Sequence, residues 1–359
     1  MTAVTIPVLP APDARPRPLP WRRMAWVTWR HHRIALSGVI ALLGAFALWL
    51  YTAGLQLHHA YAAAAACHPA SSASCMNLII KFEGMNLVLK YALVLQPVPA
   101  LIGAFIGAPM LAREIETGTF RYAWTQGFGR WRWALAKLVM VGIAVTVVAG
   151  AFTVLVSWYY QPYVAAGNRT QFSVPSVLSP GLFDVRGVAF AAWTLAAFAI
   201  GALAGMLIRR VVPAIVATLA AYCGLALIAG NLLRPHYMAL LVAKNAKIPG
   251  SALINSEWWT RGGKFAFGGQ VPFNLLPQLC PSSFKAGPGG AGVGVITGFS
   301  SHGSLTPAQC LIEHGYTHWA SFEPVSHLWP FQWIEGGWLL ALSVLLIAVT
   351  VLLVRRRAV

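Results

Sequence analysis

Two uncharged stretches, VAFAAWTLAAFAIGALAGMLI at residues 188–208 and VVPAIVATLAAYCGLALIAGNLL at residues 211–233, are separated only by Arg209 and Arg210. An apolar run of about 18 or more residues is typical of a helix that spans a membrane. Backbone in lipid must satisfy its own hydrogen bonds, and the alternating pattern of a barrel strand is absent. The two runs therefore predict a membrane hairpin of two helices joined by a short basic turn.

Four further apolar runs repeat this pattern along the chain. Residues 34–54, 138–158 and 336–354 carry no charge, and residues 87–111 carry only Lys90, which can reach the headgroups. The composition agrees, because 58% of the 359 residues are hydrophobic and 10% are charged, whereas a soluble domain has about 25% charged residues. The sequence thus predicts an all-α integral membrane protein with six transmembrane helices.

Lysine and arginine lie mainly in the segments that face the cytoplasm if both termini are inside. These short segments hold 16 of the 26 basic residues, and Arg355–Arg357 close the chain. The positive-inside rule therefore favours an N-in/C-in, multi-pass protein of the cytoplasmic (plasma) membrane. The net charge of +17 follows from this topology rather than from a basic soluble surface, so we expect no nucleic-acid partner.

Four of the five cysteines fall in two loops that this topology places outside. Cys67 and Cys75 share the first outside loop, and Cys280 and Cys310 share the last. Because disulfides form in oxidising compartments, we expect the pairs Cys67–Cys75 and Cys280–Cys310. Other connectivities, or four free thiols, remain the alternatives.

The segments outside the spans differ in character. Residues 1–20 contain six prolines and predict a disordered tail, whereas residues 21–33 place four arginines on one helical face and predict an amphipathic helix on the inner leaflet, or else an ordinary basic flank. The 102 residues between the fifth and sixth spans are too many for a bare connection and predict a folded cap. The expected organisation is a tail (1–20), an amphipathic helix (21–33), the first five spans (34–233), an extracellular cap (234–335) and the sixth span with a basic C-terminus (336–359).

Segment 112–137, between the second and third spans, reads AREIETGTFRYAWTQGFGRWRWALAK. We expect the second helix to continue to about Thr117 and to end at Gly118. Thr119 can cap a second, short helix over residues 120–126. Acidic, arginine and aromatic side chains together suit docking to another protein, although a polar turn is the simpler alternative.

The sequence carries no recognisable catalytic machinery. A phosphate-binding G-x-x-x-x-G-K-[ST] loop is absent, and no Ser/His/Asp set forms a known motif. His314 and His318 have i,i+4 spacing but lack the internal Glu of H-E-x-x-H, so solvated histidines are the better interpretation. We expect neither enzymatic activity nor a metal or cofactor in this chain.

The run Gly107–Gln126, GAPMLAREIETGTFRYAWTQ, together with the six spans and the N-terminal amphipathic helix, resembles permease subunits of type-2 ABC exporters, in particular actinobacterial members. The same six-helix architecture occurs in the G-subfamily half-transporters. The resemblance implies that residues 21–33 are a connecting helix and that segment 112–137 carries the coupling helix of a separate ABC ATPase, which would bind ATP and Mg²⁺. The coupling residues that it implies are Arg113, Glu114, Glu116, Gly118, Thr119, Arg121 and Arg130.

The resemblance further implies a dimer with a second copy or a paralogue, and a substrate path lined by the second and fifth spans. In this sequence those spans carry Gln96, Pro97, Pro99, Pro213 and Asn231. Gln96-Pro-Val-Pro99 lies near the middle of the second span, where it would form a hinge, line the path or be a static kink.

Two Gly-x-x-x-Gly pairs, Gly103/Gly107 and Gly201/Gly205, permit close helix contact within the chain or between two copies. The expected function is export of a drug-like, lipid or peptide substrate by a permease in contact with membrane lipid. The alternative is a non-transporting membrane receptor or immunity protein whose cap binds a ligand.

Overall fold

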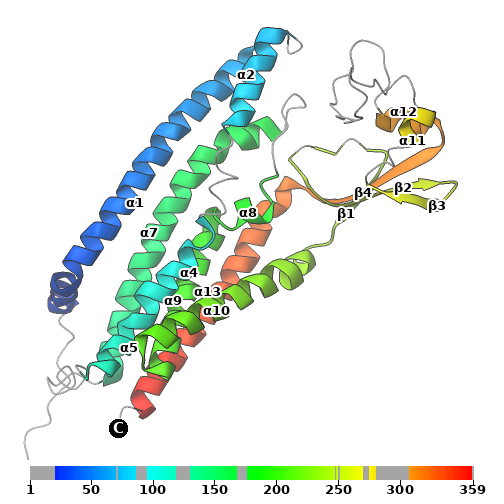
Figure 1. Ribbon diagram of the computed structural model, residues 1–359. Coiled ribbons are helices and arrows are strands. Elements are labelled where there is room, and N and C mark those ends of the chain that lie inside the picture. The colour runs from blue at the N-terminus through cyan, green and yellow to red at the C-terminus, as the bar shows by residue number, and fades with distance from the viewer. Residues whose placement is uncertain are drawn as a thin grey trace, which may run out of the picture.

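The computed structural model describes residues 21–69, 72–85, 95–118, 130–167, 176–246, 248–249, 251–269, 275–279 and 307–357. Within these ranges, the side chains of residues 21–43, 130, 276–277, 307 and 357 are not described, and the predicted tail lies outside them. The helices form one elongated bundle with a small sheet toward one end (Figure 1). At the end opposite the sheet, helix α1 (Trp21–Ala66) begins and helix α13 (Leu328–Arg357) ends. We call that end the inner end, after the predicted topology, and the other the outer end.

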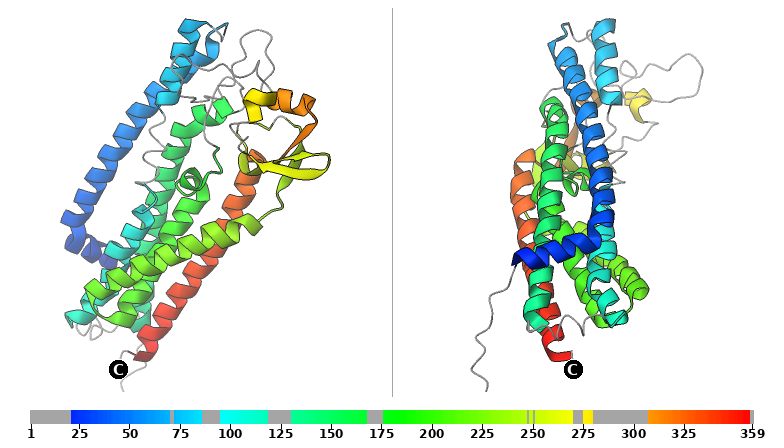
Figure 2. Two further views of the ribbon diagram at one scale, coloured as in Figure 1. Left: turned by 45° about the vertical axis from the view of Figure 1, so that its right-hand side comes forward. Right: turned by 90° about the vertical axis from the view of Figure 1, so that its left-hand side faces the viewer.

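Five helical stretches among the described residues are long and apolar enough to cross a membrane, and they correspond to the second to sixth predicted spans. The first of them combines α4 (Val98–Ile102), the π-helical turn η1 (Gly103–Gly107) and α5 (Ala108–Glu116). The others are α7 (Arg130–Gly167), α9 (Gly187–Ile208), α10 (Val211–Ile228) with its extensions η2 (Ala229–Leu233) and η3 (Arg234–His236), and α13 with the preceding turn η5 (Val325–His327). The predicted first span lies within α1, which runs beside α7 (Figures 1 and 2). The six-span topology itself stays a prediction.

Helix α9 is the centre of the bundle, and α5, α7, α10 and α13 all pack against it. Its alanines and glycines leave room for these neighbours, since small side chains let helix backbones approach closely. Ala196, Ala197 and Phe198 are fully buried. The uncharged sequence of this span is therefore explained by burial on several sides.

Helices α1 and α7 extend farther at the outer end than α9, α10 and α13 (Figure 1). Helix α7 has 38 residues, so it is roughly 57 Å long against a hydrocarbon core of about 30 Å. Helix α2 (Ala73–Gly84) turns back beside α1, and the predicted disulfide between Cys67 and Cys75 joins the two. The buried side chains of Leu57 and Phe82 belong to the core that these helices share with α7.

The first turns of α1 lie across the long axis of the bundle (Figure 2, right). This part of α1 contains the predicted amphipathic helix, residues 21–33, and is continuous with the long helix that follows it. Its arrangement agrees with a helix that lies on a membrane surface, although the side chains that would test this are outside the described set.

The segment predicted as a cap contains an antiparallel sheet, whose fold was not foreseen. The strand order is β1 (Leu241–Lys244), β4 (Tyr316–Glu323), β2 (Leu253–Arg261) and β3 (Lys264–Gly268). Gly262 and Gly263 form the β2–β3 turn with positive φ, which glycine adopts without strain. Helices α11 (Leu275–Leu279) and α12 (Pro307–Glu313) cover Trp259 and Tyr316. The protein is therefore mostly helical, but its cap contains strands as well as helices, which the prediction of an all-α protein did not include.

Only one cysteine of the second expected disulfide lies among the described residues. Cys310, in α12, is disulfide-bonded, whereas its proposed partner Cys280 lies outside the described residues. Cys223, in the fifth predicted span, is free.

Candidate functional site

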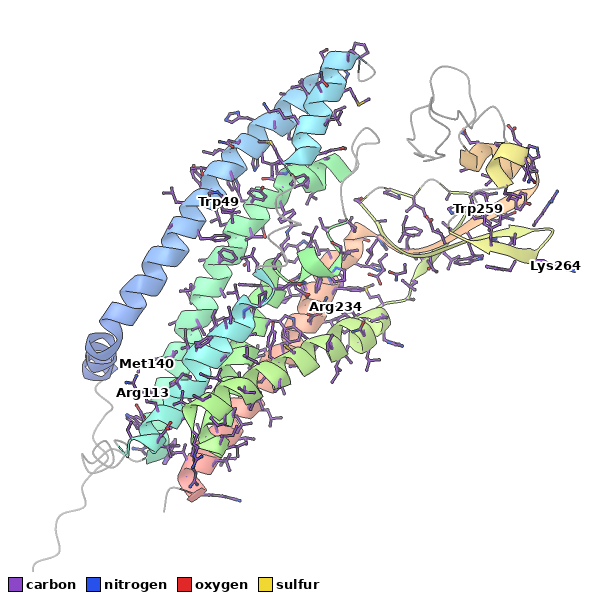
Figure 3. All side chains as sticks on the ribbon, viewed as in Figure 1. Trp49, Arg113, Met140, Arg234, Trp259 and Lys264 are labelled. Carbon is purple, nitrogen blue, oxygen red and sulfur yellow. A yellow bond between two sulfur atoms is a disulfide. The ribbon has the colours of Figure 1, made fainter. Side chains whose placement is uncertain are left out.

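The inner end of α5 carries the residues that the sequence singled out for coupling. The helix ends at Glu116, where the hydroxyl of Thr117 donates to the carbonyl of Arg113 (2.8 Å) and Gly118 takes a φ of +69°. The predicted helix end is therefore confirmed, and glycine is the residue that permits this left-handed turn. Arg113 is exposed and labelled in Figure 3.

Glu114 forms a salt bridge with Lys137 of α7. The ammonium group of Lys137 also donates to the carbonyl of Met110 (3.3 Å) and lies over the ring of Trp133 (5.2 Å). The side chains of Lys137 and Glu114 are 14% and 29% exposed, so the pair is partly shielded from water. These contacts hold together the two ends of the loop between α5 and α7.

Glu116 reaches the start of α10. Its Oε2 accepts a hydrogen bond from the backbone N–H of Val211 (3.1 Å), while Arg210, the N-cap residue, makes no side-chain cap of its own. A carboxylate at a helix N-terminus satisfies a free N–H and interacts favourably with the helix dipole. Arg209 precedes this point with a φ of 60°, an uncommon conformation for a residue other than glycine.

The structure therefore brings Glu114 and Glu116 to neighbouring helices of the same chain. Thr119, Arg121 and the expected short helix over residues 120–126 lie outside the described residues, as does the side chain of Arg130. The coupling role of the whole set stays a prediction.

The residues predicted for the path or hinge are dispersed. Gln96 and Pro97 directly precede α4, and residues 86–94 lie outside the described part of the chain, so the predicted position of Gln96 near the middle of a span stays a prediction. Pro97 and Pro99 occupy the N-cap and first turn of α4, positions that need no N–H donor. Pro213 lies in the first turn of α10, whereas Asn231 lies near its outer end in η2.

The two glycine pairs meet each other within the chain. A Cβ on Gly107 would lie 2.6 Å from the carbonyl oxygen of Phe198, and one on Gly201 would lie 2.8 Å from the backbone nitrogen of Ala108. Both distances are shorter than real Cβ contacts, and the opposing atoms are backbone. The α4–α5 stretch and α9 are thus in backbone contact, which resolves the sequence alternative in favour of packing inside one chain.

A buried ion-pair network at the outer end was not predicted. Arg234, labelled in Figure 3, donates through Nε to Glu335 Oε2 (2.8 Å) and through Nη2 to Glu335 Oε1 (2.6 Å), and it also pairs with Asp184. The Glu335 side chain is fully buried, and its Oε1 also accepts from Trp193 Nε1 (2.7 Å). Gln96 donates to Asp184 (3.4 Å). The network therefore joins the start of α4, the segment before α9, α9 itself, η3 and α13.

Tyr237 extends this network toward the cap. Burial raises the pKa of Tyr237 to about 12, so the phenol stays neutral at physiological pH. Its hydroxyl contacts Glu335 Oε2 (3.5 Å) and accepts from Trp338 Nε1 (2.8 Å). The only signal in the sequence was that Arg234 and Glu335 are the charged residues bordering the fifth and sixth apolar runs.

Among the described residues, no group of three His, Cys, Asp or Glu side chains is placed to hold a metal ion. His314 follows α12 and His318 lies in β4, so the two do not share a helical face.

The part of the chain that forms the inner end of α5 and the glycine contacts matches a known protein family. A family model described as "ABC-2 membrane transporter related" matches residues 40–234, which is just over half of the chain. No curated protein and no solved structure matches it. The match runs from α1 to Arg234 and so includes the inner end of α5 and the glycine contacts. With the five apolar helices, it identifies a multi-pass protein of the plasma membrane.

Proposed function

Because the chain belongs to the ABC-2 membrane transporter related family, we propose that it is the permease subunit of an ATP-driven exporter whose energy comes from a separate ABC ATPase. The proposed cargo is a drug-like, lipid or peptide compound that leaves across the cytoplasmic membrane. A second permease copy, or a paralogue, would complete the path.

The inner end of α5 is the observation that supports coupling. Residues 119–129 connect α5 to α7, and Glu114 and Glu116 tie the last turn of α5 to α7 and α10 respectively. A force applied to this loop by an ATPase would reach α7 through Lys137 and α10 through the N–H of Val211. Local pushing would thereby move two spans at once.

The first experiment is to purify the tagged full chain gently from native membranes and to identify the proteins that accompany it. A stoichiometric P-loop ATPase is the expected result. The complex is then reconstituted in liposomes, and its ATP hydrolysis is measured for Glu114→Ala, Glu116→Ala, Glu116→Gln and, as a control on the exposed cap, Glu313→Gln.

Glu116→Ala removes the acceptor for Val211 and should abolish substrate-stimulated hydrolysis while the protein stays folded. Glu116→Gln retains an oxygen acceptor without the charge and should keep part of the stimulation. Wild-type stimulation in Glu116→Ala and in Glu114→Ala would show that coupling does not pass through the end of α5.

The alternative function, a receptor or immunity protein, has one supporting observation. The cap is a folded sheet whose β2–β3 hairpin carries Phe265 with 71% of its surface exposed. Purification of the chain without any ATPase would favour this alternative.

A further inference from the structure

Buried polar atoms without a hydrogen-bond partner gather where the outer part of α7 meets the segment that leads into α9. Six such side-chain atoms occur in the part of the chain that the structure describes, and four belong to these two stretches. They are the hydroxyls of Tyr160, Tyr163 and Ser179 and the Nη1 of Arg186. Buried polar groups are nearly always paired, so a concentration of four calls for a physical reason.

Two of these groups are deeply buried. The side chains of Tyr160 and Tyr163 are 2% and 3% exposed, and their ring centroids lie 5.9 Å apart. They share one core with Leu182 and Val185, the residue before Arg186. Arg186 follows Val185 directly and lies within electrostatic range of Tyr160. Two phenols and a guanidinium therefore converge on one region.

The charge in this region is not balanced by the described residues. None of their carboxylates forms an ion pair with Arg186, and the nearest acid in sequence, Asp184, is paired with Arg234. An arginine is not deprotonated in proteins, although burial lowers the pKa of Arg186. All the free atoms can donate hydrogen bonds, and together they carry a positive charge.

Side chains of α13 indicate the depth at which this region would lie in a membrane. Gln332 accepts from the backbone N–H of Ala189 (2.8 Å) and donates to the carbonyl of Phe183 (3.2 Å), so it lies against the segment that contains Arg186. Trp329 and Trp333, on either side of Gln332 in the sequence, are 59% and 64% exposed. Exposed tryptophans of a membrane helix mark the headgroup level.

We propose that Arg186, Tyr160 and Tyr163 bind an anionic oxygen group, and that this group is the phosphate of an outer-leaflet lipid. Phosphate accepts charge-assisted hydrogen bonds from a guanidinium and further bonds from hydroxyls, which is the donor set present. A soluble phosphate or carboxylate offers the same chemistry, and the test separates the two sources. The site does not depend on the proposed transport function.

The test is thermal unfolding of the full chain in detergent, with phosphatidylglycerol, diacylglycerol or inorganic phosphate added. Phosphatidylglycerol should raise the unfolding midpoint of the wild type, and diacylglycerol, which lacks the phosphate, should not. Arg186→Gln and the double variant Tyr160→Phe/Tyr163→Phe should each weaken the apparent affinity about tenfold or more, whereas Arg132→Gln, at an exposed inner-end residue, should not.

The phenylalanine variant also has a readout without lipid. Since it removes only unpaired hydroxyls and keeps both rings, it should be at least as stable as the wild type in lipid-free detergent. Equal stabilisation by inorganic phosphate alone would assign the site to a soluble anion. Equal stabilisation of Arg186→Gln and wild type by phosphatidylglycerol, or no effect of any phosphate on the wild type, would overturn the proposal.

Discussion

Replacing Arg234 by methionine is expected to destabilise the protein by about 3–5 kcal/mol, because it leaves two carboxylates facing each other in the outer network. The side chain of Arg234 is 14% exposed and that of Glu335 is fully buried. Arg234 makes two hydrogen bonds to Glu335, at 2.6 and 2.8 Å, and pairs with Asp184 as well. Methionine fills a similar volume but carries no donor.

Changing the other partner should cost less. Glu335→Gln leaves the pair between Arg234 and Asp184 intact, and the amide oxygen can still accept from Trp193. We expect a loss of about 1.5–3 kcal/mol, the range for a hydrogen bond to a charged group. In the double variant the two losses in stability should not add, because both changes remove the same interaction between Arg234 and Glu335.

The assay is unfolding of the purified chain in mixed micelles by SDS, followed by tryptophan fluorescence. Arg356→Met makes the same replacement at an exposed residue of the inner end, and should be within about 0.5 kcal/mol of the wild type. If Arg234→Met costs no more than Glu335→Gln, Arg234 does not stabilise the fold by neutralising the two buried carboxylates.

Three further changes test other parts of the fold. Gly201→Ala should destabilise by about 1–3 kcal/mol in the same SDS assay because its Cβ meets backbone, whereas Gly224→Ala, which meets nothing within 4 Å, should be neutral or slightly stabilising; equal effects would contradict the close contact of α9 with η1 and α5. Cys75→Ser opens a disulfide that spans eight residues, a loss of about 2.5 kcal/mol by loop entropy, and should accelerate hydrogen exchange in α2; unchanged exchange would refute this. Burial raises the pKa of Glu323, so its ionisation opposes folding, and the thermal midpoint of the wild type relative to Glu323→Gln should fall as the pH rises from about 4.5 toward 7; a constant difference would argue against it.

The membrane part of the fold could be predicted because lipid imposes a simple rule. Runs such as residues 188–208 and 211–233 have one stable form in a bilayer, and α9 and α10 begin and end within a residue or two of those runs, η2 included. The end of α5 was equally predictable, since Gly118 is a strong local signal.

What escaped prediction depends on contacts between distant residues. Nothing near Gln96 in the sequence indicates that its amide donates to Asp184 at 3.4 Å, because the two residues are 88 positions apart. The sheet escaped for a similar reason: β1 and β4 pair across more than 70 residues, and such pairing leaves only short, ambiguous patterns. The contact of Glu116 with the backbone N–H of Val211, 95 residues away, was likewise not predictable from the sequence around Glu116.

The glycine contacts also limit how this molecule can move. Where Gly103 and Gly107 rest on the backbone of α9, no flexible side chains lie between the helices to permit sliding. We therefore expect the α4–α5 stretch and α9 to travel as one rigid block. The relative motion of any working cycle would then fall to the joints at its borders, such as the αL turn at Arg209 that leads from α9 into α10.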